Sequence, residues 1–387
     1  MRVALLSWEA VHSVYVGGVA FHVTELACAL QRKGHEVHIF TRMGRHDHAQ
    51  YECIHGVHYH RCPFQTHPDF VEEIHNMCRS FCTVFFATED HIGRFDVVHA
   101  HDWLAAPALA WIKKGRNRKS VFTIHSTEYG RCGNNNFGGS SQRVRHIEWW
   151  GAYESDAVIA VSHALKNEVQ WLYSVPDWKV GVIYNGIDYR QFDGWVEPGA
   201  IKQMYGIGPM DPMILFVGRM VYQKGPDLLT SAIPYILHYY PNAKFVFAGD
   251  GQMRWSVEDQ AAHMGVRHAC RFLGHISGWK LKDLFKAADC VCVPSRNEPF
   301  GIVILEAWSA GKPVVATSVG GPSEIVWHEV NGLKINPHPE SIAWGIGTLF
   351  QDFDDARWMG RNGRIAAESV FSWDIIADEV LAVYNSI

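Results

Sequence analysis

Two glutamates flank an apolar stretch in the segment SRNEPFGIVILEA. Glu298 and Glu306 are eight positions apart, and on one continuous helix they would lie on different faces. Pro299 disfavours helix at the residue before it and is well suited to a first helical turn. We therefore expect Glu298 in a loop, followed by a helix that begins near Phe300 and Gly301 and carries Glu306.

This segment has the groups that a sugar ligand needs. Carboxylates accept hydrogen bonds, whereas free backbone N–H groups at a helix start donate them, and hydroxyl groups require both. The alternative is that Glu298 only complements the helix dipole and that Glu306 is simply exposed.

Two cations follow another expected strand, in FVGRMVYQKGPDLL. Arg219 can hold a phosphate through two N–H groups, and Lys224, five residues later, adds a point charge. Together they suit a diphosphate. The alternative is a pair of solvated surface charges.

Polar side chains also end two strands of the N-terminal half. In VVHAHDW, alternation places His99 and His101 on one face, and His101 is the nearer to the strand end. In TIHSTEYGR, His125, Glu128 and Arg131 could bind a polyhydroxylated or phosphorylated ligand. Packing of His101 and capping of the following helices are the alternatives.

A glycine pair follows the first strand. Gly17 and Gly18 precede a helix, and Glu9 lies in the same loop. Such a loop lets the backbone approach an anion, although a plain tight turn is the alternative. Neither this loop nor GDG at 249–251 completes the dinucleotide-binding G-x-G-x-x-G pattern, so a dehydrogenase is poorly supported.

The elements that carry these residues alternate between short apolar strands and amphipathic helices, which predicts open parallel sheets. The alternation of strands and helices is interrupted over 188–212 and then resumes, so we expect two doubly wound α/β domains. Their ligand site should lie in the cleft between them. The expected strands begin with RVALLS, HEVHIF, FDVVHAH, SVFTIHS, DAVIAVS and VGVIYNG, and continue with MILFVGR, AKFVFAGDG, CRFLG, DCVCVPS, KPVVATS and GLKIN.

The composition is that of a globular protein with sizeable cores. Of the 387 residues, 48% are hydrophobic and 19% charged, with a net charge of −5 and scattered Lys and Arg. We expect no nucleic-acid surface and no membrane-spanning segment. The N-terminus does not resemble a signal peptide, and several of the nine cysteines lie in apolar runs, which indicates free thiols in a reducing cytoplasm.

Histidines are numerous, and they are densest with two cysteines over residues 46–62, from His46 to Cys62. A metal site there is the alternative to a β-hairpin around Gly56 with polar residues on one face. No zinc-ligand spacing is met, so the sequence predicts a hairpin and no metal.

Taken together, the motifs resemble those of the retaining GT-B glycosyltransferases of family 4 and their glycogen and starch synthase relatives. The resemblance rests on motifs that follow one another along the chain in the order of that family: the early Gly-Gly, VVHAHDW, VSH, VIYNGID, VGRMVYQKG, E-x7-E within EPFGIVILEA, and GKPVVATSVGGPSEIV. It spans nearly the whole chain and leans toward the glycogen synthases. One difference is Tyr15, where the long bacterial glycogen synthases carry Lys.

The resemblance implies a GT-B fold: a first, acceptor-side domain over 1–190 to which a helix over 371–387 crosses back, and a nucleotide-sugar-binding domain over 191–370. In the second domain, it implies that Arg219 and Lys224 bind the donor diphosphate and that Glu306 binds the ribose. Glu298, with the backbone of residues 300–301, would hold the transferred sugar.

For the first domain, the resemblance implies that Gly17 and Gly18 approach the donor phosphates and that His101 lies near the reacting end of the sugar. Arg219, Lys224, Glu298 and His101 are thus the expected catalytic groups. The expected acceptor-side residues are Glu9, His125, Glu128, Arg131 and Asn185.

The implied activity is metal-independent hexosyl transfer with retention, from ADP- or UDP-glucose to an α-glucan, with the nucleotide-sugar as substrate and no cofactor. A sugar phosphate, lipid-linked sugar or other polysaccharide is an alternative acceptor. A glycoside hydrolase using the two glutamates, a nucleotide-sugar epimerase, and a non-catalytic carbohydrate- or nucleotide-binding protein are the alternatives of other classes.

Overall fold

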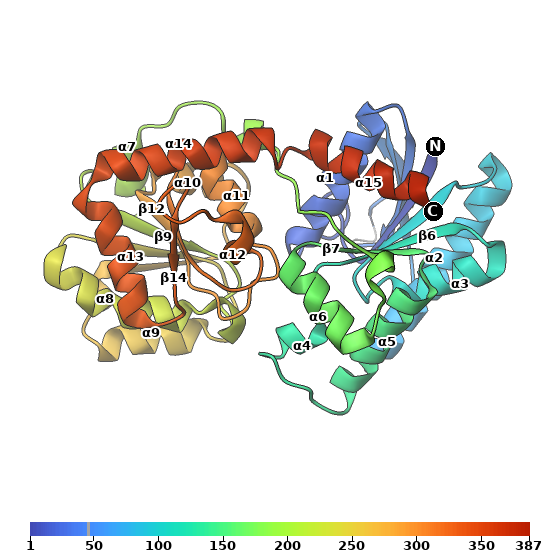
Figure 1. The fold of residues 1–387 in the computed structure, drawn as a ribbon, viewed down its shortest axis with the longest axis horizontal. Helices are drawn as coiled ribbons and strands as arrows, with labels where there is room; N and C mark the ends of the chain where they lie inside the picture. The colour runs from blue at the N-terminus through green and yellow to red at the C-terminus, as the bar shows by residue number, and fades with distance from the viewer. Residues whose placement is uncertain (45–46) are drawn as a thin grey trace. The chain divides into compact units, whose positions relative to one another are not determined.

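The computed structural model describes residues 1–44 and 47–387. The chain divides into two compact units: unit 1 comprises Met1–Gly186 and Trp373–Ile387, and unit 2 comprises Ile187–Ser372. Each unit has its own sheet, with helices packed on both faces (Figure 1). The boundaries expected from sequence, after residues 190 and 370, lie a few residues from these.

Unit 1 contains an eight-stranded sheet in the order β3-β4-β2-β1-β5-β6-β7-β8. All neighbours are parallel except β3 and β4, which form an antiparallel hairpin. The strands are β1 (Arg2–Ser7), β2 (Glu36–Arg42), β3 (Tyr51–Ile54), β4 (Val57–Cys62), β5 (Val97–His101), β6 (Lys119–Ile124), β7 (Ala157–Ala160) and β8 (Val180–Val182). The helices are α1 (Gly18–Arg32), α2 (Phe70–Ile92), α3 (Ala106–Arg116), α4 (Glu128–Arg131), α5 (Ser140–Glu154), α6 (His163–Tyr173), the short 3-10 helix η1 (Asp177–Lys179) and α15 (Trp373–Ser386).

Unit 2 contains a six-stranded, all-parallel sheet in the order β11-β10-β9-β12-β13-β14. Its strands are β9 (Met213–Val217), β10 (Lys244–Ala248), β11 (Cys270–Gly274), β12 (Cys290–Val293), β13 (Val314–Thr317) and β14 (Leu333–Ile335). Its helices are α7 (Pro198–Met204), α8 (Pro226–Tyr239), α9 (Arg254–His263), α10 (Gly278–Ala287), α11 (Ile302–Ser309), α12 (Pro322–Ile325), α13 (Pro339–Gln351) and α14 (Phe353–Ser369). Three short 3-10 helices complete it: η2 (Tyr189–Phe192), η3 (Tyr222–Lys224) and η4 (Arg267–Ala269).

The strands are apolar because helices cover both faces of each sheet. β1 is buried from Val3 onward, and all four residues of β12 are buried. The strand expected over 180–186 is shorter than predicted, because β8 ends at Val182. β8 lies at the edge of the sheet beside β7, which ends at Ala160. Ile183 N still donates to the Ala160 carbonyl oxygen at 3.0 Å, and residues 184–186 lie beyond the end of β7.

The C-terminal helix α15 packs in the core of unit 1. Figure 1 shows it in red beside α1 in blue. Trp373, Ile376 and Tyr384 are buried in the same cluster as the apolar residues of β1 and α1. The Tyr384 hydroxyl lies 2.8 Å from Nδ1 of the buried His99, which fixes the helix to β5.

The hairpin expected around Gly56 is formed by β3 and β4. The rings of His58 and His60 stack on that of His38 of β2, and His60 is buried. The histidines of β4 are therefore covered by neighbouring rings, whereas Tyr51 and Cys53 of β3 are exposed. His46, which belongs to the histidine-rich segment considered as an alternative metal site, lies outside the described residues.

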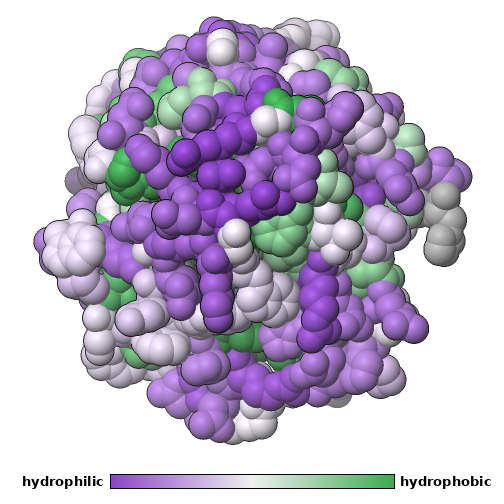
Figure 2. Space-filling model, turned by 90° about the vertical axis from the view of Figure 1, so that its right-hand side faces the viewer, coloured by the Kyte–Doolittle hydropathy of each residue, from purple (hydrophilic) through white to green (hydrophobic). Residues whose placement is uncertain are grey.

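The nine cysteines of the described chain are free thiols, six of them buried. None of the described helices combines the length and the apolar character needed to cross a membrane. On the face shown in Figure 2, hydrophilic side chains predominate and hydrophobic ones form small separate patches.

Candidate functional site

The strand order identifies one ligand position in each sheet. In open parallel sheets, ligands bind beyond the carboxyl ends of the strands, where two adjacent strands lead their chains in opposite directions. In unit 2 these strands are β9 and β12, and in unit 1 they are β1 and β5. The predicted site residues follow these four strands or β6, with the exception of Asn185.

In unit 2, the loops after β9 and β12 join through an ion pair. Lys224 Nζ lies 2.9 Å from Oε1 and 2.7 Å from Oε2 of Glu298, and the Ser295 hydroxyl donates to Oε2 at 3.1 Å. Glu298 is 6% exposed. The cation assigned to phosphate and the carboxylate assigned to the sugar thus lie together.

Arg219 follows Gly218 at the end of β9. It is exposed, and its guanidinium has no hydrogen-bond or ion-pair partner among the described residues. An exposed, unpaired guanidinium in the same loop as Lys224 is suited to an anionic ligand.

Close backbone contacts hold the Glu298 loop in place. The carbonyl oxygen of Glu298 accepts a hydrogen bond of 2.9 Å from Gly321 N. Gly320 has a φ of 58°, and a Cβ atom there would lie 2.0 Å from the same carbonyl oxygen. Only glycine fits at Gly320, so the loop after β13 fixes the loop after β12.

The helix that carries Glu306 begins where Pro299 predicts. α11 starts at Ile302, and Gly301 precedes it with a φ of 98°. Glu306 is the fifth helical residue and is partly buried. Burial raises its pKa to about 7, an effect that Lys282 opposes through its charge.

In unit 1, Glu9 organises the glycine loop after β1. Its Oε2 accepts hydrogen bonds of 2.8 Å from the backbone N–H groups of Val16 and Gly17. The Gly17 N–H expected to approach a phosphate is therefore already bonded. Gly18 is the first residue of α1.

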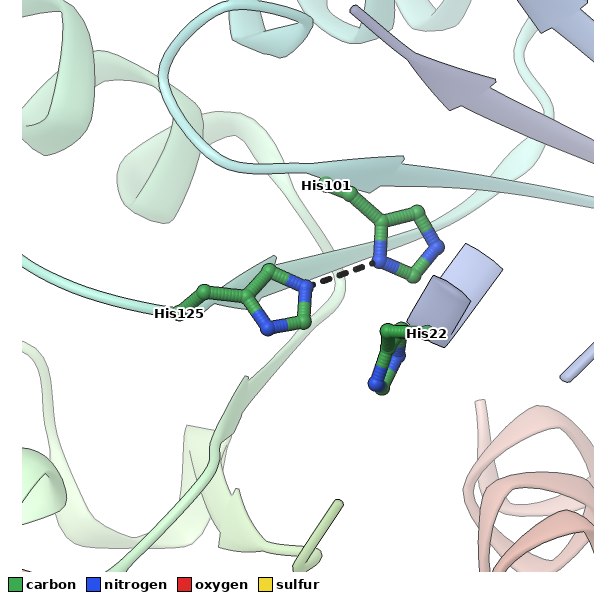
Figure 3. Close-up of side chains that lie close together, drawn as sticks. All are labelled: His22, His101 and His125. Carbon is green, nitrogen blue, oxygen red and sulfur yellow. Dashed lines mark hydrogen bonds between the residues drawn. The ribbon is translucent and has the colours of Figure 1, made fainter. Parts of the chain in front are cut away.

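Three histidines converge at the same edge of unit 1 (Figure 3). His101 ends β5, and His125 follows β6, with 3.3 Å between Nδ1 of the former and Nε2 of the latter. His22 of α1 lies beside both rings and contacts Asn185 Oδ1 through Nδ1 at 2.8 Å. The structure thus brings the predicted His101, His125 and Asn185 together.

Glu128 and Arg131 belong to a buried ionic network. Arg131 pairs with Glu128 at 3.2 Å and with the buried Glu148 of α5 at 2.5 Å. Tyr173 donates to Glu148, which also accepts from the backbone N of Glu128. Burial raises the pKa of Glu148, while the Arg131 charge opposes that rise. This network shapes the loop after β6.

Asp102 has a specific role in the same loop. Its carboxylate accepts a hydrogen bond of 2.8 Å from the backbone N of His125, and its φ is 58°. Among the described residues no side chain caps α3, so Asp102 does not cap the helix that follows it.

Sequence reasoning missed His22 and Glu148. Both interrupt an apolar helical stripe: His22 precedes the buried Leu26 by four positions, and Glu148 lies between buried Val144 and Ala152 at the same spacing. A polar residue at a core position of a helix must find a partner, and this signal could have identified both.

The match to known proteins covers nearly the whole chain. Residues 16–191 match the model described as Glycosyltransferase Family 4, and residues 199–366 match the model described as Glycosyl transferases group 1. An uncharacterized glycosyltransferase of Methanocaldococcus jannaschii is 41% identical over 100% of this chain and 98% of its own length. The chain belongs to the family 4 glycosyltransferases.

This glycosyltransferase is also 32% identical to a glycogen synthase of Mycobacterium tuberculosis, over 99% of the chain and 94% of the relative. Among solved structures, a sucrose-phosphate synthase of Thermosynechococcus elongatus gives a TM-score of 0.85 at 24% identity, covering 100% of this chain and 98% of that one. Anabaena HepE in complex with UDP-glucose gives 0.80 at 21% identity, with 100% of both chains covered. These likenesses show the GT-B fold.

Proposed function

We propose that this glycosyltransferase moves glucose from ADP- or UDP-glucose to a hydroxyl group of an α-glucan, with retention at the anomeric carbon and without a metal ion. The observation that carries this proposal is the Lys224–Glu298 ion pair, with the unpaired Arg219 at the end of the neighbouring strand. The pair lies where two adjacent strand ends of unit 2 create a ligand position.

Each group of unit 2 has a role in donor binding. Arg219 and Lys224 bind the diphosphate, because both offer positive charge at the end of β9. The partly buried Glu306 accepts hydrogen bonds from the ribose hydroxyls. Glu298 and the backbone N–H groups at 300–301 bind hydroxyls of the transferred glucose.

The chemical problem is the charge on the leaving group. As the bond from the anomeric carbon to the diphosphate oxygen breaks, negative charge accumulates on the diphosphate and the sugar becomes oxocarbenium-like. Cations held in place beforehand stabilise that charge without reorganisation. The acceptor oxygen then bonds to the same face of the anomeric carbon, and the departing phosphate oxygen takes the acceptor proton.

The residues of unit 1 serve the sugar end of the reaction. His101 positions the reacting groups, and the loop after β6, with His125, Glu128 and Arg131, faces the acceptor. Similarity to the mycobacterial glycogen synthase supports a glucan acceptor, and the UDP-glucose bound to a protein of the same fold supports a glucose donor.

One panel of incubations tests the proposal. The full chain is incubated with ADP-, UDP- or GDP-glucose, alone or with glycogen, glucose 1-phosphate or glucose 6-phosphate. Released nucleotide is assayed, and the anomeric configuration of the product is read by NMR. We expect glycogen-dependent release of ADP or UDP and an α-linked product, both unaffected by EDTA.

Other outcomes would overturn the proposal in distinct ways. Conversion of the donor without an acceptor would indicate an epimerase, and cleavage of glycogen without a nucleotide would indicate a hydrolase. Saturable binding with no nucleotide release from any pair would indicate a binding protein. Nucleotide release that requires glucose 1-phosphate or glucose 6-phosphate would show that the acceptor is a sugar phosphate and not a glucan.

A further inference from the structure

The three histidines at the end of the unit 1 sheet have the geometry of a metal site. One ligand atom from each of His22, His101 and His125 can be chosen so that all three lie within 4.8 Å of one another. Figure 3 shows the three rings converging from α1, from the end of β5 and from the loop after β6. The 3.3 Å between the facing nitrogens of His101 and His125 equals the separation, about 3.3 Å, of two nitrogens on a tetrahedral Zn²⁺.

The proton position on His22 favours metal binding. Nδ1 of His22 lies 2.8 Å from Asn185 Oδ1, which can only accept, so Nδ1 carries the proton and Nε2 carries the lone pair. A second N–H bonded to an oxygen is what orients metal-bound imidazoles in proteins. Burial lowers the pKa of all three rings, that of His125 to about 3, so they are neutral near pH 7.

One nitrogen of the cluster is left without a partner. Nε2 of His101 is buried and has no hydrogen bond among the described atoms, and His101 is 1% exposed. A buried polar atom without a partner is destabilising, so the hydrogen bonds of His101 are not all satisfied by the described residues. His125 is partly exposed and provides the approach from solvent.

Nearby charges can balance a cation. The Asp102 carboxylate accepts a hydrogen bond from the backbone N of His125. Burial raises the pKa of Glu9, and the charge of the nearby Asp102 adds to that rise. Arg131 is the opposing charge, but Glu128 and Glu148 already pair with it.

We propose that His22, His101 and His125 bind a first-row transition metal ion of the Zn²⁺, Ni²⁺ or Cu²⁺ class. Imidazole nitrogens suit these ions, whereas Mg²⁺ and Ca²⁺ require oxygen ligands. The ligands are 79 and 24 residues apart in sequence, so a search by zinc-motif spacing does not find them. The ion is an inhibitor rather than a participant in transfer. This second statement rests on the proposed function, because the metal would occupy the lone pairs with which His101 and its neighbours meet the sugar.

Metal binding itself is measured first, without reference to activity. The EDTA-treated full chain is titrated with Zn²⁺ by calorimetry and with Co²⁺, whose visible absorption reports tetrahedral nitrogen ligation. We expect one ion per chain for wild type and at least tenfold weaker binding for His22→Ala and for His125→Ala. Asn185→Ala leaves all three ligands in place but removes the orienting oxygen, and we expect about 10–100-fold weaker binding.

His58→Ala is the matched control, because it removes a histidine from the stacked cluster of the hairpin and should leave the affinity unchanged. Thermal unfolding of each variant establishes that it is folded. Absence of saturable binding by folded wild type would overturn the proposal, as would binding that His58→Ala abolishes and the His22 and His125 variants retain.

The activity experiment separates this proposal from the proposed function. We expect Zn²⁺ to inhibit nucleotide release by wild type and EDTA to reverse the inhibition. Zn²⁺ binding by a chain that transfers no sugar would contradict the proposed function alone. Transfer by a chain that binds no Zn²⁺ would contradict the metal site alone, and bound Zn²⁺ that leaves transfer unchanged would contradict the inhibitory role.

Discussion

Lys224 Nζ lies 2.7 Å from Glu298 Oε2, although the two residues are 74 positions apart and follow different strands. The cation and the carboxylate therefore orient one another, and both are fixed at the carboxyl end of the unit 2 sheet. A substrate that contacts either group meets a side chain whose position the other group determines.

Lys224→Ala should lower kcat/KM for the donor by about 10²-fold or more, because one preorganised cation at the leaving group is lost. It should also lower the free energy of unfolding by about 2 kcal/mol, since Glu298 is left buried without its partner. Steady-state kinetics and urea unfolding measure the two effects.

The double variant Lys224→Ala/Glu298→Ala provides the control for this pair. The effects of substituting two residues that act as a unit do not add, so the double variant should lose little more activity than Lys224→Ala alone. Additive losses would show that the two groups act independently.

Arg219→Ala should affect binding and turnover but not stability. The guanidinium is exposed and unpaired, so its removal should change the free energy of unfolding by less than about 0.5 kcal/mol. Turnover should fall by about 10²-fold. Arg357→Ala, at an exposed position of α14, is the matched control and should change neither quantity. Near-normal transfer by Arg219→Ala would contradict the assigned role.

Donor affinity should rise with pH through the titration of Glu306. Its folded-state pKa of about 7 lies above its ordinary value of 4.5, and ribose hydroxyls donate best to the ionised carboxylate. The dissociation constant of the nucleoside diphosphate, measured at pH 6 and pH 8, should show a pH dependence that Glu306→Gln reduces. An identical profile for both chains would exclude Glu306 from the nucleotide site.

Ionisation of Glu306 should lower the stability of the folded protein, whereas it should raise donor affinity. Because the folded state holds the proton more tightly than the unfolded chain, stability falls as pH rises from about 4.5 to 7. Glu306→Gln should therefore be more stable than wild type at pH 8, by roughly 1 to 3 kcal/mol, and not at pH 4. Thermal unfolding at the two pH values measures the difference.

Gly320→Ala should displace the Glu298 loop. The added Cβ would lie 2.0 Å from the Glu298 carbonyl oxygen, and the φ of 58° is unfavourable for alanine, so both stability and turnover should fall. Gly347→Ala is the matched control, because it lies in α13 and, apart from its chain neighbours and the adjacent helix backbone, no described atom lies within 4 Å of the new methyl group. It should be neutral or slightly stabilising.

Glu148→Ala should destabilise unit 1 by about 3–5 kcal/mol, because the Arg131 charge is left buried with fewer partners. Glu148→Leu combined with Arg131→Met should recover much of the loss, since it removes both charges. Urea unfolding distinguishes the two variants. Equal destabilisation by both would mean that the apolar pair cannot pack at these positions.

Much of the fold follows from local patterns in the sequence. Apolar runs place the strands, Pro299 divides the loop of Glu298 from α11, and Gly34, with a φ of 83°, follows the end of α1. The predicted strand over 180–186 ends early, at Val182, because β7 ends at Ala160 and offers Ile183 only one more hydrogen bond.

The pairing of site residues is less accessible from sequence. Lys224 meets Glu298 because β9 and β12 are neighbours, and sheet order is a property of the whole unit. His22 and Glu148 were overlooked because each is a single polar residue inside an amphipathic helix, and its partner lies far along the chain. Arg131, predicted to face an acceptor, pairs instead with Glu148, and the sequence did not indicate this pair because Glu148 itself was not recognised.

The placement of α15 has a consequence for the order in which the protein is completed during synthesis. Unit 1 needs residues from both ends of the chain: Trp373 packs against His22, and Tyr384 bonds to His99. Unit 2 is a continuous segment whose first and last residues, Ile187 and Ser372, pair with one another. A ribosome therefore delivers all of unit 2 before it delivers the helix that finishes unit 1. The unit that is translated first is therefore the last to acquire its full core, and a chain that ends at Ser372 contains all of unit 2 but lacks the helix that completes unit 1.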